Sequence, residues 1–174
     1  LRDFHQTSEL DILIKSILEE KKNFSSNIPI AIKISPDLSQ SQIEDISEIL
    51  INNKVETVII SNSTDRHREN LSNINKFEKG GLSGKPIENM SNKIINQFYN
   101  LVGKQIKIIG VGGVDSAKGA YEKILSGATL VQLYTGMVYK GPRIATHINS
   151  ELIKILEQDG INNINEIIGS KKST

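Results

Sequence analysis

The chain has 174 residues and a formal net charge of +1, from 21 basic and 20 acidic side chains. This balance argues against the strongly basic surfaces that attract nucleic acid or anionic membranes. The sequence contains no cysteine, which excludes disulfide bonds, thiolate metal sites and a cysteine nucleophile within these residues. Every apolar run is far shorter than the roughly 18 residues that a membrane-spanning helix needs.

The first part of the chain predicts a helix, a strand and a second helix. Residues 8–22 place apolar side chains at helical spacing, which predicts an amphipathic helix. Residues 28–34 form an apolar run rich in β-branched side chains, which is typical of a buried strand. Ser39 and Gln42 have the spacing of a capping box, and apolar residues continue a helix over 43–50.

The middle of the chain predicts a strand, a long connection and a helix. Residues 55–60 form the strand. The polar segment 61–90 contains a glycine-rich run, and a connection this long inside a compact domain is usually functional or has structure of its own. Apolar side chains then mark a helix over 94–102, with Gly103 as its C-terminal stop.

The last third of the chain predicts two further strands, each followed by a helix. Residues 106–111 and 130–134 are short apolar runs that predict strands. Apolar side chains recur at helical spacing over 117–125, where Gly127 closes the pattern, and again over 144–155.

One helix followed by four strand–helix units predicts an α/β fold with a parallel sheet. The strands are almost continuously apolar, as is typical of parallel strands that are covered on both faces. No change of composition divides the chain, so we expect a single domain over 1–174 that ends in a polar tail from about residue 170.

Two consecutive predicted strands end in small residues. Gly110-Val111-Gly112-Gly113 ends one strand, and Tyr134-Thr135-Gly136 ends the next. Asp115 stands where a dinucleotide-binding fingerprint needs a third glycine, which disfavours a Rossmann fold. Either run alone suits a tight strand–helix turn. Together they favour a phosphate site at the rim of a β/α barrel, where N–H groups at helix N-termini bind an anion.

Lys33 and Asn62 lie near the C-terminal ends of the first two predicted strands, where β/α barrels carry their chemistry. Lysine is rarely buried without a partner. Lys33 therefore either serves a site or extends its ammonium group to the surface. The amide of Asn62 offers a donor and an acceptor to a planar ligand, and an ordinary turn is the alternative.

The remaining candidate residues do not predict a site. His5, His67 and His147 lack the spacing of metal ligands, so we expect no metal site. Arg66 and Arg68 lie in the long polar segment, where we expect them to be solvated.

Five blocks of the sequence, taken in order, resemble the C-terminal half of the class 2, quinone-dependent dihydroorotate dehydrogenases. Each block alone is a weak signal, and their order makes the resemblance specific. It runs nearly end to end, from Leu1-Arg2 to about Gly169. The blocks are Ile32-Lys33-Ile34-Ser35-Pro36-Asp37-Leu38-Ser39, Ser61-Asn62-Ser63-Thr64, Gly80-Gly81-Leu82-Ser83-Gly84-Lys85-Pro86, Gly110-Val111-Gly112-Gly113 and Gln132-Leu133-Tyr134-Thr135-Gly136.

This resemblance implies the C-terminal half of a (β/α)8 TIM barrel that binds FMN. The reaction it implies is the oxidation of dihydroorotate to orotate in pyrimidine biosynthesis, with ubiquinone as the electron acceptor. Because a complete barrel needs about 250 residues, we expect the chain to be a fragment that lacks the N-terminal half of the barrel.

The resemblance also implies a role for each matching residue. Lys33 would contact the flavin ring, where a cation stabilises the charge that develops on reduction. Asn62 and Ser63 would bind the pyrimidine. Ser61 and Gly84 would make further FMN contacts. Gly113, Tyr134 and Thr135 would bind the FMN phosphate.

The chain departs from the family pattern in two respects. Ser61-Asn62-Ser63-Thr64 replaces a common Thr-Asn-Thr-Thr, and Tyr134-Thr135 replaces a common Tyr-Ser; both changes keep the hydroxyl donors. The catalytic base of the family is a serine in an Asn-x-Ser-Pro-Asn loop, which we expect upstream of Leu1. We therefore assign no catalytic residue to this chain and expect the isolated fragment to be inactive.

The resemblance implies peripheral association with an inner membrane, bacterial or mitochondrial, through the N-terminal region. Three alternatives stay open from the sequence. One is another FMN-dependent barrel oxidoreductase, such as a class 1 dihydroorotate dehydrogenase. Another is a phosphate-binding barrel without redox activity, and the third is a half-barrel that functions only by pairing with another chain.

Overall fold

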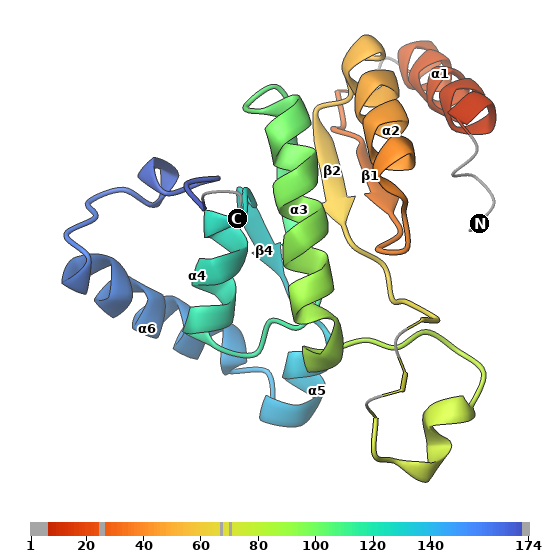
Figure 1. Ribbon diagram of the computed structural model, residues 1–174. Helices are drawn as coiled ribbons and strands as arrows, with labels where there is room; N and C mark the ends of the chain where they lie inside the picture. Colours follow the sequence, from red (N-terminus) through yellow and green to blue (C-terminus); the bar gives the residue numbers. More distant parts are fainter. Residues whose placement is uncertain (1–6, 25–26, 67, 70, 172–174) are drawn as a thin grey trace.

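The computed structural model describes residues 7–24, 27–66, 68–69 and 71–171. It contains a four-stranded parallel sheet in the order β1-β2-β3-β4, as the sequence predicts. Its strands are β1 (Ala31–Ile34), β2 (Thr57–Ile60), β3 (Lys107–Val111) and β4 (Leu130–Gln132). The helices are α1 (Thr7–Asn23), α2 (Gln40–Asn52), α3 (Glu88–Val102), α4 (Ala117–Leu125), α5 (Thr135–Lys140) and α6 (Ile144–Gln158) (Figure 1).

Most predicted elements are confirmed, with local differences. β1 begins at Ala31 rather than residue 28, after Pro29, which has no N–H to donate to a strand ladder. α3 begins at Glu88, six residues before the predicted helix. α5 was not predicted: it has six residues, too few to show helical periodicity.

The capping box is confirmed at the start of α2. The Ser39 hydroxyl accepts a hydrogen bond from the Gln42 N–H at 3.3 Å, and the Gln42 side chain accepts one from the Ser39 N–H at 2.9 Å. Ser116 caps α4 in a similar way, accepting from the Gly119 N–H at 3.2 Å. These side chains satisfy N–H groups that the first helical turn leaves free.

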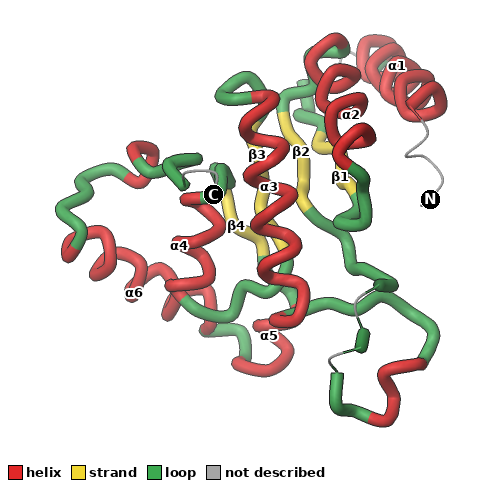
Figure 2. Tube along the Cα trace, viewed as in Figure 1, coloured by secondary structure: helices red, strands yellow, loops and turns green. Residues whose placement is uncertain are grey.

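The helices α2, α3 and α4 pack on one face of the sheet (Figures 1 and 2). The expectation of strands covered on both faces is wrong for the described residues, because burial alternates along each strand. Ile34, Ile60 and Gly110, which are paired in register, face the helices and are buried. The neighbouring row of Lys33, Ile59, Ile109 and Leu130 lies on the opposite, more open face.

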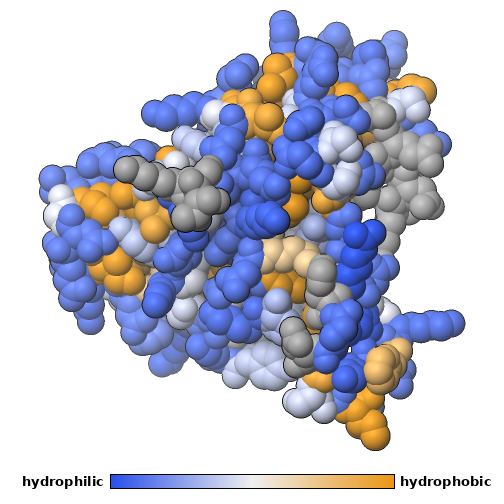
Figure 3. Space-filling view, in the orientation of Figure 1, coloured by the Kyte–Doolittle hydropathy of each residue, from blue (hydrophilic) through white to orange (hydrophobic). Residues whose placement is uncertain are grey.

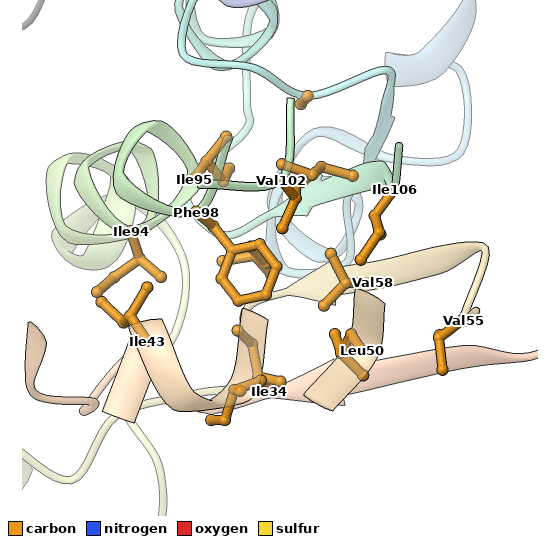
Figure 4. Close-up of a cluster of buried hydrophobic side chains, with 14 of the residues drawn as sticks. Ile34, Ile43, Leu50, Val55, Val58, Ile94, Ile95, Phe98, Val102 and Ile106 are labelled. Carbon is orange, nitrogen blue, oxygen red and sulfur yellow. The ribbon is translucent and has the colours of Figure 1, made fainter. Parts of the chain in front are cut away.

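The main hydrophobic core lies between this sheet and α1, α2 and α3. Phe98 of α3 is fully buried at its centre, next to Val58 and Ile34 (Figure 4). Two smaller clusters join α4 to α6 and β4. The second of these includes Ile167, so the segment after α6 folds back onto α4. The backbone N–H groups of Gly169 and Lys171 then donate to Ile124 and Leu125.

The tail predicted from about residue 170 is therefore attached to α4 as far as Lys171, and residues 172–174 lie outside the described part. Within the described part, no helix is both long enough and apolar enough to cross a bilayer.

The connection between β2 and α3 has structure of its own, as its length predicts. Thr64 and Leu82 form an antiparallel bridge at its base. Between them, a short 3-10 helix (Ile74–Phe77) extends away from the sheet. Ile74 and Phe77 are 90% and 83% exposed. Apolar colour is visible at this extension in the space-filling view (Figure 3).

Candidate functional site

The candidate site lies at the C-terminal ends of the strands, where the turn after β2 is bonded to both neighbouring strands. The Ser61 N–H donates to the Val111 carbonyl at 3.1 Å, and the Asn62 N–H donates to the Ile34 carbonyl at 2.9 Å. These bonds fix the backbone of Ser61 and Asn62 between the ends of β1 and β3. The predicted flavin and pyrimidine contacts at these positions therefore lie together at the C-terminal end of the sheet.

The side chains of this turn differ in exposure. Ser61 is buried, and its hydroxyl donates to the Asn62 carbonyl at 3.1 Å. Asn62 is exposed and Ser63 is half-buried. Thr64 is fully buried and donates from Oγ1 to Asp37 Oδ1 at 2.5 Å. The turn thus presents Asn62 to solvent from a backbone that is anchored at both ends.

Lys33 is exposed on the open face of β1, opposite Ile59 in the β1–β2 register. The sequence left two alternatives for Lys33, a role in a site and an ammonium group that extends to the surface, and an exposed side chain is compatible with both. That surface is the sheet face that no described helix covers. Lys33 is therefore available to a ligand on the open face.

The turns that follow β3 and β4 lie in direct contact. A Cβ placed on Gly136 would come within 2.5 Å of the Val114 carbonyl oxygen. A Cβ on Gly84 would lie 2.8 Å from Thr135 Cγ2, and the hydroxyls of Ser83 and Thr135 are 3.0 Å apart. Three segments distant in the sequence thus meet at one place, which brings Gly84 and Thr135 together beside the turn that contains Gly113.

The backbone conformation at this meeting point requires glycine. Gly113 is buried and has a φ of 78°, and Gly84 has a φ of 77°. L-residues rarely adopt such values. Tyr134, by contrast, is 73% exposed and is the N-cap residue of α5, where its side chain makes no capping hydrogen bond.

Backbone donors at these turns fit an anionic group. Among the described residues, the N–H groups of Gly113 and Thr135 have no partner in the protein, and Thr135 opens a helix. Free N–H groups at the start of a helix favour a phosphate or carboxylate. The donor set therefore suits an anionic group such as a phosphate.

Charged side chains surround the turn after β3. Lys85 Nζ lies 2.7 Å from Glu88 and 3.5 Å from Asp115, and Lys140 Nζ lies 3.4 Å from Asp115. Partial burial by itself would raise the pKa of Asp115, but Lys85 and Lys140 outweigh it and hold that pKa below its ordinary value. The hydrogen bond to Glu88 raises the pKa of Lys85. Lys85 and Asp115 are therefore both charged at neutral pH.

A polar groove of about 830 Å³ lies outside this site, between α3 and α4. Its walls include Asn89, Asn96 and Lys118, and none of the eight predicted site residues lines it. The groove lies on the face of the sheet that the helices cover, whereas the predicted site lies at the C-terminal ends of the strands. Through Lys85 and Glu88 it nevertheless adjoins the turn after β3, although it holds none of the predicted flavin and pyrimidine contacts.

The other polar candidates have structural roles or lie outside the described residues. His147 lies 3.1 Å from Glu151 on α6, and His5 and His67 are outside the described part. The described residues contain no group of three metal-ligating side chains. Arg68 is not solvated as expected. Its guanidinium donates to the carbonyls of Lys76, Glu78 and Gly80.

Lys123 is a buried residue that the sequence analysis did not select. It is fully buried between α4 and α3, and its Nζ donates to Ser91 Oγ and Asn92 Oδ1. A sequence signal did exist, because Lys123 is three residues after the apolar Ala120 and next to Ile124. A lysine on the apolar face of a helix indicates a buried polar partner.

The chain is similar to dihydroorotate dehydrogenases by sequence and by structure. A sequence model of the dihydroorotate dehydrogenase family matches residues 1–156. A dihydroorotate dehydrogenase (quinone) of Bartonella tribocorum is 40% identical over 171 residues, which is 95% of this chain and 47% of the relative. The mitochondrial enzyme of the same name from Arabidopsis thaliana is 45% identical over 143 residues, covering 82% of this chain and 31% of the relative.

A solved structure shows the same fold. The DHODH of Eimeria tenella in complex with ferulenol superposes with a TM-score of 0.91 at 31% identity, covering 97% of this chain and 50% of that one. The chain thus spans about half the length of the relatives it matches, or less.

Proposed function

Because the chain belongs to the dihydroorotate dehydrogenase family, we propose that it carries the FMN-phosphate site and part of the orotate site of the quinone-dependent enzyme. The proposed reaction oxidises dihydroorotate to orotate in pyrimidine biosynthesis and passes the electrons to a quinone. The observation that carries the proposal is the contact between the turns after β3 and β4, with free N–H groups at Gly113 and Thr135.

In this proposal Gly113, Tyr134 and Thr135 hold the phosphate. The N–H groups of Gly113 and Thr135 donate to phosphate oxygens, and the Thr135 hydroxyl is a further donor. Gly84 lets its loop approach Thr135, since a Cβ at position 84 would overlap the Thr135 methyl group. The glycine pattern is therefore explained by close packing around the donors.

The flavin ring is assigned to the open face of the sheet, beside Lys33 and Ser61. When bound, FMN supplies a two-electron acceptor for the substrate hydride. The exposed ammonium group of Lys33 would stabilise negative charge on the ring. The Ser61 N–H is hydrogen-bonded to the Val111 carbonyl, which fixes the position of Ser61 at the C-terminal end of the sheet.

The pyrimidine contacts are assigned to Asn62 and Ser63. The Asn62 amide offers both a donor and an acceptor to the ring of orotate, and the Ser63 hydroxyl adds a second polar contact. Because the Asn62 N–H is bonded to the end of β1, the side chain projects from an anchored backbone. No catalytic base is assigned to this chain.

The proposal also includes partners. We assign the open sheet face and the two sheet edges to the N-terminal half of an eight-stranded barrel. That half would bring the catalytic base, the quinone site and peripheral attachment to an inner membrane. Without it, the chain should bind FMN weakly and should not oxidise dihydroorotate.

Flavin binding by the 174-residue chain tests the proposal. Titration of FMN should quench flavin fluorescence, and Thr135→Val should weaken the affinity about tenfold through loss of a hydrogen bond to a charged group. Thr129→Val is the matched control, because Thr129 is also half-buried but lies before β4. It should leave the affinity unchanged.

Two results would contradict the proposal. One is binding of inorganic phosphate without any binding of FMN, which would indicate a phosphate-binding barrel without redox activity. The other is robust quinone reduction by the isolated chain with dihydroorotate, which would overturn the assignment of the catalytic base to the N-terminal half of the barrel.

A further inference from the structure

A fully buried lysine connects α4 to the candidate site. Lys123 Nζ donates to Ser91 Oγ at 3.0 Å and to Asn92 Oδ1 at 2.7 Å, both on α3. Burying an ammonium group is unfavourable unless its donors are satisfied. The proposed flavin and pyrimidine contacts do not include this residue, so its burial needs another explanation.

Gly110 makes room for the lysine stem above β3. A Cβ at position 110 would lie 2.7 Å from both Cγ and Cδ of Lys123. The aliphatic part of Lys123 thus occupies the place of a strand side chain. Its ammonium group is thereby directed past the sheet to α3.

Ser91 connects Lys123 to the end of β3 through a second hydrogen bond. Its hydroxyl, which accepts from Lys123, donates to the Val111 carbonyl at 2.7 Å. The same carbonyl accepts the Ser61 N–H at 3.1 Å. One carbonyl group therefore joins α3, the turn after β2 and the residue that precedes Gly112 and Gly113.

Two charged groups face the lysine from the neighbouring segment. Burial lowers the pKa of Lys123 to about 8, while Glu88 acts to raise it and Lys85 to lower it further. The amine can donate to both Ser91 and Asn92 in its protonated and in its neutral form. The hydrogen bonds therefore do not depend on the charge.

We propose that Lys123 is a positioning residue that, through Ser91 and the Val111 carbonyl, holds the turn after β2 and the glycine turn after β3 in their ligand-binding arrangement. The inference rests on the proposed function, because those turns are the proposed FMN contacts. In this inference α4 contributes to the site indirectly, because Lys123 acts through Ser91 and does not contact the proposed ligand.

Amide hydrogen exchange of the 174-residue chain, without flavin, tests the positioning directly. Lys123→Met keeps the length of the stem and removes the donors. It should speed exchange of the Ser61 N–H about tenfold relative to that of Ile59 in the same strand region, since Ser61 loses a fixed acceptor. Lys118→Met, which removes an exposed lysine from the same helix, should leave the ratio unchanged.

A double-variant cycle distinguishes a chain of contacts from general loosening of the fold. Ser91→Ala should reproduce the effect with Lys123 still present. If Lys123 acts through Ser91, the double variant should exchange no faster than Ser91→Ala alone. Additive effects, or equal acceleration at Ser61 and Ile59, would overturn the inference. Should Lys123→Met fail to fold, Lys123→Gln, whose uncharged polar side chain is a milder change at a buried site, replaces it in the cycle.

FMN titration adds a second readout. Both single variants should weaken FMN binding about tenfold, in proportion to the loss of turn order. Wild-type FMN affinity in both variants, despite faster exchange, would show that the turns do not bind flavin. If the wild-type chain bound no FMN, the proposed function would fail while the exchange result still tested the role of Lys123.

Discussion

At the scale of single residues, a comparison of Gly113 with Gly141 distinguishes the cost of backbone strain from the cost of a steric clash. Gly113 and Gly141 have nearly equal φ values, 78° and 80°. A Cβ on Gly113 would lie 2.3 Å from Glu88 Cβ and 2.7 Å from Glu88 Cα, whereas nothing lies within 4 Å of one on Gly141. An alanine at either position therefore has the same backbone strain, and only the one at 113 meets another residue.

Gly141→Ala should lower the free energy of unfolding by about 1 kcal/mol, from backbone strain alone. Gly113→Ala should lower it by a further 1–3 kcal/mol or so, because the start of α3 must move. Urea denaturation of the two variants measures the difference. Equal destabilisation would show that Glu88 yields without cost, contrary to the packing described.

The buried Lys123 predicts a pH dependence of stability. Its pKa is lowered from 10.5 to about 8 in the folded chain, chiefly by burial. Between these values the unfolded chain binds the proton more tightly, so the free energy of unfolding rises with pH. From pH 7 to pH 10, wild type should gain about 2 kcal/mol relative to Lys123→Met. Parallel urea-derived curves for the two proteins would contradict the lowered pKa.

At the scale of secondary structure, local sequence signals predicted the ends of some elements well. Ser39 and Gln42 fixed the start of α2, because a capping box depends only on residues within one turn. The start of α3 at Glu88 was missed, since its first turn is polar and Lys85 and Pro86 precede it in a 3-10 helix. Its position depends on contact with Gly113, which is far away in the sequence.

The long connection between β2 and α3 is organised by one side chain. The Arg68 guanidinium donates to the carbonyls of Lys76, at 3.2 Å, of Glu78, at 2.6 Å, and of Gly80. A planar guanidinium can serve several acceptors at once, whereas an ammonium group acts as a compact point charge. The sequence showed a polar loop but not this bond set, because the three carbonyls belong to the backbone.

Arg68→Lys should therefore loosen the connection without unfolding the sheet. Cleavage after Glu78 by a glutamate-specific protease should become about tenfold faster, as local opening becomes easier. Arg66→Lys is the control, because the Arg66 side chain is exposed. Equal rates for Arg68→Lys and wild type would show that the carbonyl contacts do not restrain the loop.

At the scale of the whole molecule, the sheet has helices on one face and two edges, β1 and β4, that pair with no other described strand. The order of strands and helices was predictable because apolar periodicity reports each element separately. The open face was not, since Ile59 and Ile109 on it are as apolar as residues on the covered face. Periodicity shows that a residue is apolar, not what covers it.

The open face should make the isolated chain self-associate. Leu130, on the edge strand β4, is 60% exposed, and unpaired edges with apolar side chains favour association. Leu130→Lys should shift sedimentation toward the monomer. Ile153→Lys, at a position on α6 that is 57% exposed, should not. A monomeric wild-type chain at all concentrations would contradict this expectation.

Gly110 and Lys123 share one volume, since the stem of the lysine fills the space above the glycine. Neither position can change in size without a compensating change in the other. Related sequences should therefore vary at 110 and 123 together, with a larger strand residue accompanied by a shorter helix residue. Such joint variation would show that the packing of this helix residue against this strand residue is maintained across the family.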